Sequence, residues 1–210
     1  MTRRLMGIAR ALVILAAAPG ALALVADAAQ TPAPIQVRDV SGGTVAPFAP
    51  RGAANVLFFV QTDCPISNWY AQTIQRVCRE YAGKGVGCLL MYEDIESGGT
   101  PLDALIRTHL AEFRYQGIPA VADRTRAVAS QAKATITPQA VVVDRRGAIR
   151  YRGRIDNAFA DFGKPRRHVT SHELRDALDA LVDGRPIRTP ETEALGCFIV
   201  DPASLRTHHE

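Results

Sequence analysis

Residues 56–70 read VLFFVQTDCPISNWY, and the rest of the chain is arranged around them. The first half is an apolar run of β-branched and aromatic residues, which is typical of a buried strand. The run ends shortly before Cys64, and apolar residues then recur at three- and four-residue spacing as far as Tyr81, which predicts a helix with one buried face. Pro65 suits the first helical position, where a backbone N–H is not needed. Cys64 is therefore expected at or next to the N-cap of this helix.

The position of Cys64 predicts a reactive thiol. Unpaired backbone N–H groups and the positive end of the helix dipole favour the thiolate, which is the nucleophilic form of cysteine. The alternative is a buried, inert cysteine at a strand–helix junction. A Cys-Pro pair that opens a helix directly after a core strand favours the reactive interpretation.

Residues 1–28 are expected to be a signal peptide. Arginines lie in the first ten residues, an apolar run follows at 11–18, and Ala26-Asp27-Ala28 matches a cleavage site. The apolar run is short and is broken by Pro19-Gly20, so an uncleaved membrane anchor is the alternative. We expect a periplasmic or secreted mature protein that has no stable membrane insertion once the leader is removed.

The composition is that of one ordinary globular domain. The 210 residues are 47% hydrophobic and 22% charged. Loss of residues 1–28 would take away three arginines and one aspartate and lower the formal net charge from +4 to +2. Basic residues are not interleaved with aromatics along any stripe, so a nucleic-acid partner is not expected. The histidines show no metal-ligand spacing, and no cofactor or metal is expected.

All four cysteines follow the predicted leader, and an even number in an exported protein permits two disulfides. Cys78 falls on the buried face of the first helix, and Cys88 falls on the strand that follows a tight glycine-rich turn. This placement predicts a structural Cys78–Cys88 disulfide. Two buried free thiols that pack as small hydrophobic side chains are the alternative.

The order of predicted elements indicates an α/β fold in which a central mixed sheet has helices on both faces. Residues 29–53 are expected to form a linker with a strand pair, 54–183 the main domain, and 184–210 a tail that carries Cys197. Within the domain, strands are predicted at residues 54–61, 86–92, 118–122, 140–144 and 148–155, and helices at residues 65–81, 100–113, 124–134 and 170–183.

Several local features accompany these elements. Thr100 is expected to cap the second helix, whose apolar face would include Leu105. His109 lies close to that face and is interpreted as a structural residue. Residues 170–173 are expected to form a capping box, and residues 164–167 a solvated loop.

Three motifs in this order resemble the thioredoxin superfamily. They are Cys64-Pro65 at a strand–helix junction, Thr137-Pro138 before a strand, and residues 143–147 leading into Tyr151-Arg152-Gly153. The chain looks most like exported redoxins of the alkyl-hydroperoxide-reductase/thiol-specific-antioxidant type. The resemblance covers residues 35–183, and similar bacterial redoxins carry a tail like that around Gly196-Cys197. It implies a thioredoxin-like fold in which Pro138, preceded by Thr137, is a cis-proline that faces Cys64 and presents backbone to a bound thiol or peptide.

The chain departs from the family patterns at three positions. Ser67 stands where the second cysteine of a Cys-x-x-Cys motif would be, so a resolving thiol must come from elsewhere. Thr62 lies two residues before Cys64, whereas peroxiredoxins place a threonine three residues before their reactive cysteine. Asn68 stands where copper-delivery thioredoxin-like proteins have their second cysteine, which leaves that metal site incomplete.

These observations predict an exported thiol oxidoreductase that acts on a disulfide or a peroxide through Cys64. Cys78 is roughly 20 Å further along the helix and cannot resolve Cys64. Cys197 follows a proline-containing linker, so we expect it to be the resolving partner, and residues 198–200 to dock beside Trp69. The alternatives for Cys197 are a spare thiol or a bond between subunits.

The partner class is a protein thiol or disulfide, or a peroxide, with an electron donor that the sequence does not identify. Two other functions remain open. One is a copper-handling or binding protein without turnover, since thiolates suit Cu(I). The other is a scaffold whose cysteines form structural disulfides only.

Overall fold

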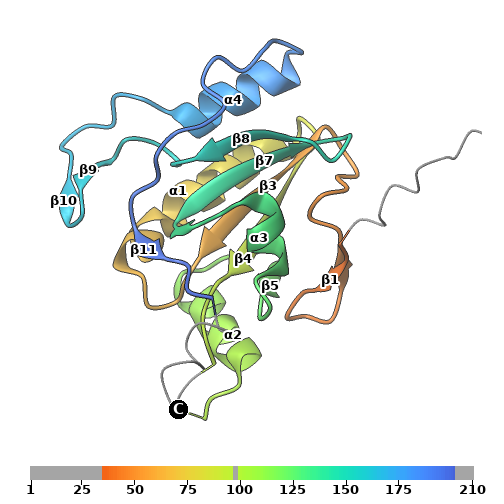
Figure 1. The fold of residues 1–210 in the computed structure, drawn as a ribbon, viewed down its shortest axis with the longest axis vertical. Coiled ribbons are helices and arrows are strands. Elements are labelled where there is room, and N and C mark those ends of the chain that lie inside the picture. Colours follow the sequence, from red (N-terminus) through yellow and green to blue (C-terminus); the bar gives the residue numbers. More distant parts are fainter. Residues whose placement is uncertain (1–34, 97–98, 202–210) are drawn as a thin grey trace, which may run out of the picture. The chain divides into compact units, whose positions relative to one another are not determined.

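The computed structural model describes residues 35–96 and 99–201 of the chain (Figure 1). The predicted signal peptide and its cleavage site lie outside these residues. No helix in the described ranges is long and apolar enough to cross a lipid bilayer.

The central sheet has five strands in the order β5, β4, β3, β7, β8. Their bounds are Ala120–Ala122 for β5, Val86–Tyr92 for β4, Ala54–Val60 for β3, Gln139–Asp144 for β7 and Ile149–Gly153 for β8. The pairs β3–β4 and β4–β5 are parallel, whereas β7 runs antiparallel to β3 and to β8. The predicted mixed sheet is confirmed, and the strand that leads to Cys64 is its central strand.

Helices cover both faces of this sheet (Figure 1). The helices α1 (Pro65–Ala82), α2 (Leu102–Glu112) and α4 (Glu173–Val182) send their apolar side chains into one core cluster. The short helix α3 (Ala127–Ala132) packs into the other cluster. Successive residues of β3 alternate between the two clusters, so nearly every side chain of this strand is buried. This is why residues 54–60 lack the polar alternation of a half-exposed strand.

Two short hairpins flank the domain. The predicted N-terminal strand pair is present as β1 (Val37–Arg38) and β2 (Thr44–Val45). Residues predicted as a plain loop instead contribute a strand, because β10 (Lys164–Pro165) pairs with β9 (Phe159–Asp161) in an exposed hairpin.

The predicted Cys78–Cys88 disulfide is confirmed. The chain runs down α1, turns at residues 83–85 and returns along β4, which brings the two Cα atoms to 5.8 Å. The bridge therefore joins the end of the first helix to the strand that follows it.

Sequence reasoning did not find two short strands that position the tail. Strand β6 (Ile136–Thr137) immediately precedes Pro138, and β11 (Cys197–Phe198) pairs with it antiparallel, with Cys197 opposite Thr137. A two-residue strand has no periodicity that a sequence could display. The tail after α4 therefore returns to the domain and adds a strand beside the proline.

Three local predictions were wrong. Helix α2 begins after Pro101 and not at a Thr100 cap, and Leu105 on its expected apolar face is 37% exposed. The capping box before α4 does not form. The Glu173 carboxylate instead accepts hydrogen bonds from Arg154 and Ser171, and His172 takes the N-cap position.

Candidate active site around Cys64 and Cys197

Cys64 occupies the N-cap of α1, where β3 gives way to the helix. Its backbone is extended, Pro65 takes the first helical position, and the cysteine side chain makes no capping hydrogen bond. The Cys64 sulfur is therefore not used to cap the helix and can act as a nucleophile. The side chain is only 1% exposed, so the groups packed against it decide what can reach it.

The Thr137–Pro138 peptide lies opposite Cys64 and is cis, as the resemblance implied. The Cys64 thiol donates a hydrogen bond to the Thr137 carbonyl oxygen, with a distance of 3.2 Å between sulfur and oxygen. The Thr137 hydroxyl donates to Gln61 Oε1 at 2.7 Å, and Gln61 Nε2 donates to the Glu93 carbonyl oxygen at 3.3 Å. The segment with the cis bond is thus tied to the loop that precedes Cys64.

Cys197 reaches Cys64 from the tail. The two sulfur atoms are 2.7 Å apart, and the Cys197 thiol donates toward Cys64. A disulfide of about 2.05 Å would need them to close by only about 0.7 Å. Neither cysteine is bonded to another, so the structure brings together two free thiols that lie 133 positions apart in the sequence.

Gly196 allows this approach. A Cβ atom at position 196 would lie 1.9 Å from the Thr137 carbonyl oxygen and 3.1 Å from Pro138 Cδ, so any larger residue would collide with the cis segment. Gly196 thus lets the tail backbone lie close to the cis segment, and this position brings the thiol of the next residue, Cys197, to Cys64.

The surroundings of Cys64 and Cys197 move their pKa values in opposite directions. Burial by itself would raise the pKa of Cys64, but hydrogen bonds from the Cys197 thiol and from Ser67 outweigh it and lower the pKa. Burial, the hydrogen bond to Cys64, and the charges of Cys64 and Asp63 raise the pKa of Cys197 to about 12. At neutral pH Cys64 is therefore the more readily ionised of the two.

Ser67 acts on Cys64 from the next turn of α1. Its side chain is buried, and its hydroxyl bonds to no other group of residues 35–96 and 99–201. It is therefore free to face the sulfur, and both this hydroxyl and the Ser67 backbone N–H favour the thiolate. The residue that replaces the second thiol of a Cys-x-x-Cys motif thus stabilises the first.

A buried polar chain supports the loop before Cys64. Asn68 Nδ2 donates to the Thr62 carbonyl oxygen at 2.9 Å, and Asn68 Oδ1 lies 2.8 Å from His109 Nε2. An amide oxygen only accepts, so His109 carries its proton on Nε2 and accepts from the Tyr92 hydroxyl at Nδ1, 2.9 Å away. Burial lowers the pKa of His109 to about 4, which keeps it neutral. The structural role expected for His109 is confirmed.

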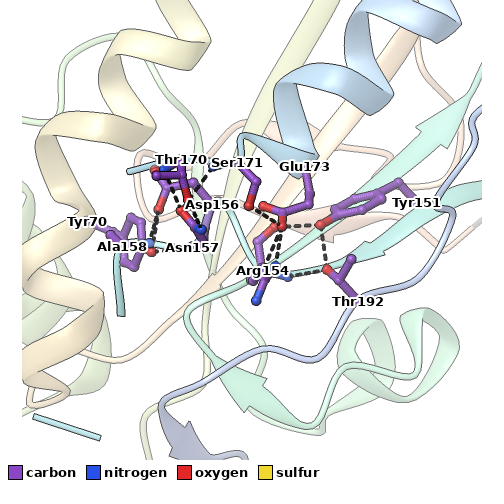
Figure 2. A network of polar contacts seen from close by, with 10 residues as sticks. All are labelled: Tyr70, Tyr151, Arg154, Asp156, Asn157, Ala158, Thr170, Ser171, Glu173 and Thr192. Atoms are coloured by element: carbon purple, nitrogen blue, oxygen red, sulfur yellow. Dashed lines mark hydrogen bonds and ion pairs between the residues drawn. The ribbon is translucent and has the colours of Figure 1, made fainter. Parts of the chain in front are cut away.

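A second polar network holds the tail upstream of Cys197 (Figure 2). The Thr192 hydroxyl lies 2.8 Å from the Tyr151 hydroxyl and accepts from the Arg154 backbone N–H at 3.1 Å. A Cβ atom at Gly153 would lie 2.0 Å from Thr192 Oγ1, so a glycine is again needed where the tail crosses the sheet edge. Arg154 in turn binds Glu173 at the start of α4. The tail is therefore anchored on β8 before it reaches β6.

The predicted docking of the tail beside Trp69 was wrong. The tail docks by backbone pairing on β6, and Phe198, which was expected to fill an apolar groove, is 75% exposed. Backbone groups at the edge of β6 provide hydrogen bonds that the aromatic surface lacks. Trp69 is 48% exposed and packs edge-to-face on Phe159.

A cleft of about 290 Å³ opens beside Pro138. Its lining includes Tyr70 from α1, Phe159 from β9 and Leu195 from the tail, together with charged side chains such as Arg154 and Glu193. Elsewhere in the described ranges, no group of three or more histidine, cysteine or acidic side chains is placed to hold a metal ion.

Comparison with known proteins gave no match to a family model and none to a curated protein. Solved structures do match. A protein of Geobacillus kaustophilus described as an uncharacterized conserved protein shares 28% identity at a TM-score of 0.68, over 80% of this chain and 88% of that one. A hypothetical protein of Sinorhizobium meliloti 1021 shares 26% identity at a TM-score of 0.66, over 80% of this chain and 90% of that one.

A thioredoxin-like protein from Aeropyrum pernix has a TM-score of 0.51 at 13% identity, over 72% of this chain and 89% of that one. At that identity the likeness concerns the fold. The sheet order and the cis-proline opposite a helix N-terminal cysteine agree with it. The chain has the thioredoxin-like fold.

Proposed function

We propose that the protein is an exported thiol–disulfide oxidoreductase, in which Cys64 is the nucleophile and Cys197 the resolving thiol. One observation carries the proposal: two free thiols, one of them at a helix N-terminus opposite a cis-proline, lie 2.7 Å apart. The predicted leader and the Cys78–Cys88 bridge agree with an oxidising compartment. Among redoxins, the alkyl-hydroperoxide-reductase/thiol-specific-antioxidant type is the branch we propose.

The reaction has two exchange steps. The Cys64 thiolate attacks one sulfur of a substrate disulfide, a bond forms between them, and the other substrate sulfur leaves as a thiolate that takes up a proton. Cys197 then loses its proton and attacks the Cys64 sulfur, which releases the second substrate thiol. The substrate gains two electrons, and the protein holds a Cys64–Cys197 disulfide. An external dithiol donor returns it to the reduced form, and the same steps in reverse oxidise a substrate dithiol.

The opposed pKa values support this order of attack. Two of the causes that raise the pKa of Cys197 are its hydrogen bond to Cys64 and the negative charge of Cys64. Both end when Cys64 is bonded to a substrate sulfur. The pKa of Cys197 then falls, so the resolving thiol becomes nucleophilic only after the first step has occurred.

The test uses two single variants and glutathione disulfide as the probe. Cys197→Ser is expected to accumulate a glutathione adduct on Cys64, visible by mass spectrometry, and to lose multiple turnover. Cys64→Ser is expected to form no adduct on Cys197 under the same conditions. Turnover at the wild-type rate in Cys197→Ser would overturn the resolving role.

A parallel reaction with hydrogen peroxide separates the two substrate classes. In that case Cys64 would be oxidised to a sulfenic acid with loss of water, and Cys197 would condense with it to a disulfide. If peroxide forms the disulfide much faster than glutathione disulfide does, the protein is a peroxidase and the exchange proposal fails.

A further inference from the structure

Arg126 lies at the junction between the domain and the tail. It precedes α3, its backbone is left-handed at φ +58°, and its side chain is buried. The guanidinium donates to four backbone carbonyl oxygens. Three belong to the domain: those of Asp123 and Glu93 at 2.8 Å and that of Asp94 at 3.3 Å. The fourth belongs to Val200 in the tail, 3.1 Å from Nε.

The three bonds within the domain fix the orientation of the guanidinium. The guanidinium is planar and its N–H donors have fixed directions. Once three of its hydrogen bonds are made, a fourth bond to the tail costs little further side-chain entropy. The end of β4 and the loop before α3 therefore hold a donor in advance at the place where the tail passes. Val200 lies three residues beyond Cys197 and just past the end of β11, so this donor holds the tail immediately after the strand that carries the resolving thiol.

Glu93 does not account for the burial of Arg126 as a simple counter-ion. Its Oε2 lies 3.3 Å from Arg126 Nε, but neither carboxyl oxygen makes a hydrogen bond to any described residue. Burial and the charge of Asp123 raise the pKa of Glu93 to about 9, although Arg126 acts in the opposite direction. The guanidinium therefore relies on the carbonyl oxygens, of which one is in the tail.

The other contacts of β11 are few, and one is a hydrogen bond of 3.3 Å from the Thr137 hydroxyl to the Cys197 carbonyl oxygen. The ladder of β11 with β6 covers two residues, which is marginal for a strand pair, and beyond it the Ile199 N–H donates to the Thr135 carbonyl oxygen at 2.9 Å. Phe198 is exposed and contributes little burial, whereas Cys197 and Ile199 are partly buried against the two core clusters. Upstream, the tail is anchored at Thr192 (Figure 2). Arg126 is thus the downstream end of a clamp around Cys197.

The same clamp controls access to Cys64. The Cys64 sulfur contacts the Thr137 carbonyl oxygen and the Cys197 sulfur and is almost fully buried. A substrate sulfur must come into direct contact with the Cys64 sulfur, where the Cys197 sulfur now lies. Strand β11 therefore has to move away for the first step and return for the second.

We propose that Arg126 is a positioning residue for the resolving cysteine: by holding the Val200 carbonyl oxygen it keeps β11 on β6, and so keeps Cys197 over Cys64. This inference rests on the proposed function. Loss of the bond is expected to have two opposite effects, easier access to Cys64 and slower resolution by Cys197.

The access test needs no catalytic activity. In a Cys197→Ser background, native protein is labelled with a bulky maleimide, and the rate at which Cys64 is modified is measured. Adding Arg126→Gln is expected to raise that rate by about tenfold to a hundredfold, the range for loss of one hydrogen bond to a charged group. Arg124→Gln is the matched control, because Arg124 is an exposed neighbour that pairs with Asp103. An unchanged rate in Arg126→Gln would overturn the inference.

The resolution test uses the protein with all its cysteines. Arg126→Gln is expected to accumulate the Cys64–glutathione mixed disulfide and to convert it to the Cys64–Cys197 disulfide about tenfold or more slowly than the wild type. Arg126→Lys keeps a positive charge beside Glu93 and so protects the fold, but it lacks the fork of donors. It is expected to behave like Arg126→Gln, and wild-type behaviour in Arg126→Lys would refute the positioning role.

Ile199→Pro separates this role from general stability. It removes the N–H that bonds Thr135 and the Ile199 side chain that packs against the α3 core cluster, but none of the four carbonyl groups that Arg126 bonds. The single variant is expected to show both effects, and the double variant with Arg126→Gln no more than the larger single one. Additive effects would show that Arg126 does not act through the position of β11.

If maleimide labelling rises but neither the wild type nor any variant exchanges glutathione, the clamp stands and the proposed function fails. If exchange is normal and labelling is unchanged, the proposed function stands and the clamp fails.

Discussion

Replacement of Gly196 by alanine tests whether the backbone contact between tail and cis segment sets the reaction rate. The added Cβ would lie 1.9 Å from the Thr137 carbonyl oxygen and 2.7 Å from its carbon. These atoms belong to the backbone next to a cis peptide and cannot swing aside as the end of a flexible side chain can. The tail must therefore move.

The size of the movement follows from the geometry. Real Cβ atoms essentially never come closer than 3.0 Å to another heavy atom, so the 1.9 Å contact must open by at least 1.1 Å. Misplacement of a reacting group by about 1 Å costs on the order of a hundredfold in rate. We expect Gly196→Ala to slow resolution by Cys197 about a hundredfold, whereas attack by Cys64 on glutathione disulfide proceeds at least as fast as in the wild type.

The assay mixes reduced protein with glutathione disulfide, quenches with acid, and follows the mixed disulfide and the internal disulfide by mass spectrometry. Gly83→Ala is the control, because Gly83 has φ −68° and a Cβ atom added there would meet no heavy atom within 4 Å. Resolution at the wild-type rate in Gly196→Ala would refute the contact. Equal slowing of both steps would point instead to damage of the fold.

Three further results are expected. Replacing both Cys78 and Cys88 by alanine should lower the free energy of unfolding by about 2–3 kcal/mol, because the closed loop spans only 10 positions, and should leave exchange turnover unchanged. The pKa of Glu93 is raised from 4.5 to about 9 in the folded state, so the unfolded state releases its proton first and stability falls as the pH rises between these values. Denaturant titrations should show a decline of at most about 1.4 kcal/mol per pH unit, and Glu93→Gln should flatten it. Alkylation of Cys64 in reduced protein should titrate below the ordinary thiol range, and Cys197→Ala, which removes a hydrogen-bond donor, should raise its midpoint.

The elements built from local patterns could be predicted from the sequence. The run before Cys64 and the spacing after it predicted β3 and α1, and the tight turn between Cys78 and Cys88 predicted their bridge. The position of Thr137-Pro138 before a strand, combined with the family resemblance, led to the cis bond. The strand, the helix and the cis bond depend on residues that are neighbours in the sequence, and the disulfide depends on two elements that a short turn places side by side.

The docking of the tail could not be predicted because it depends on backbone groups far apart in the chain. Nothing in the two residues of β11 distinguishes a strand from a loop, and an exposed Phe198 suggested an apolar contact that the fold does not use. Arg126 fell within the helix predicted at residues 124–134, where it resembled any other charged helical residue. The one available signal was Gly196, since a glycine directly before a lone tail cysteine indicates a close backbone approach.

The anchor at Thr192 also determines what happens when the strand leaves (Figure 2). Only four residues separate Thr192 from Cys197, and a flexible tether of these five Cα–Cα steps has a mean span of about 12 Å. A released Cys197 therefore stays within a small volume around Cys64 and is present there at a local concentration in the millimolar range. A free thiol in solution would have to approach that concentration to intercept the mixed disulfide, so the tether favours completion of the reaction within one molecule.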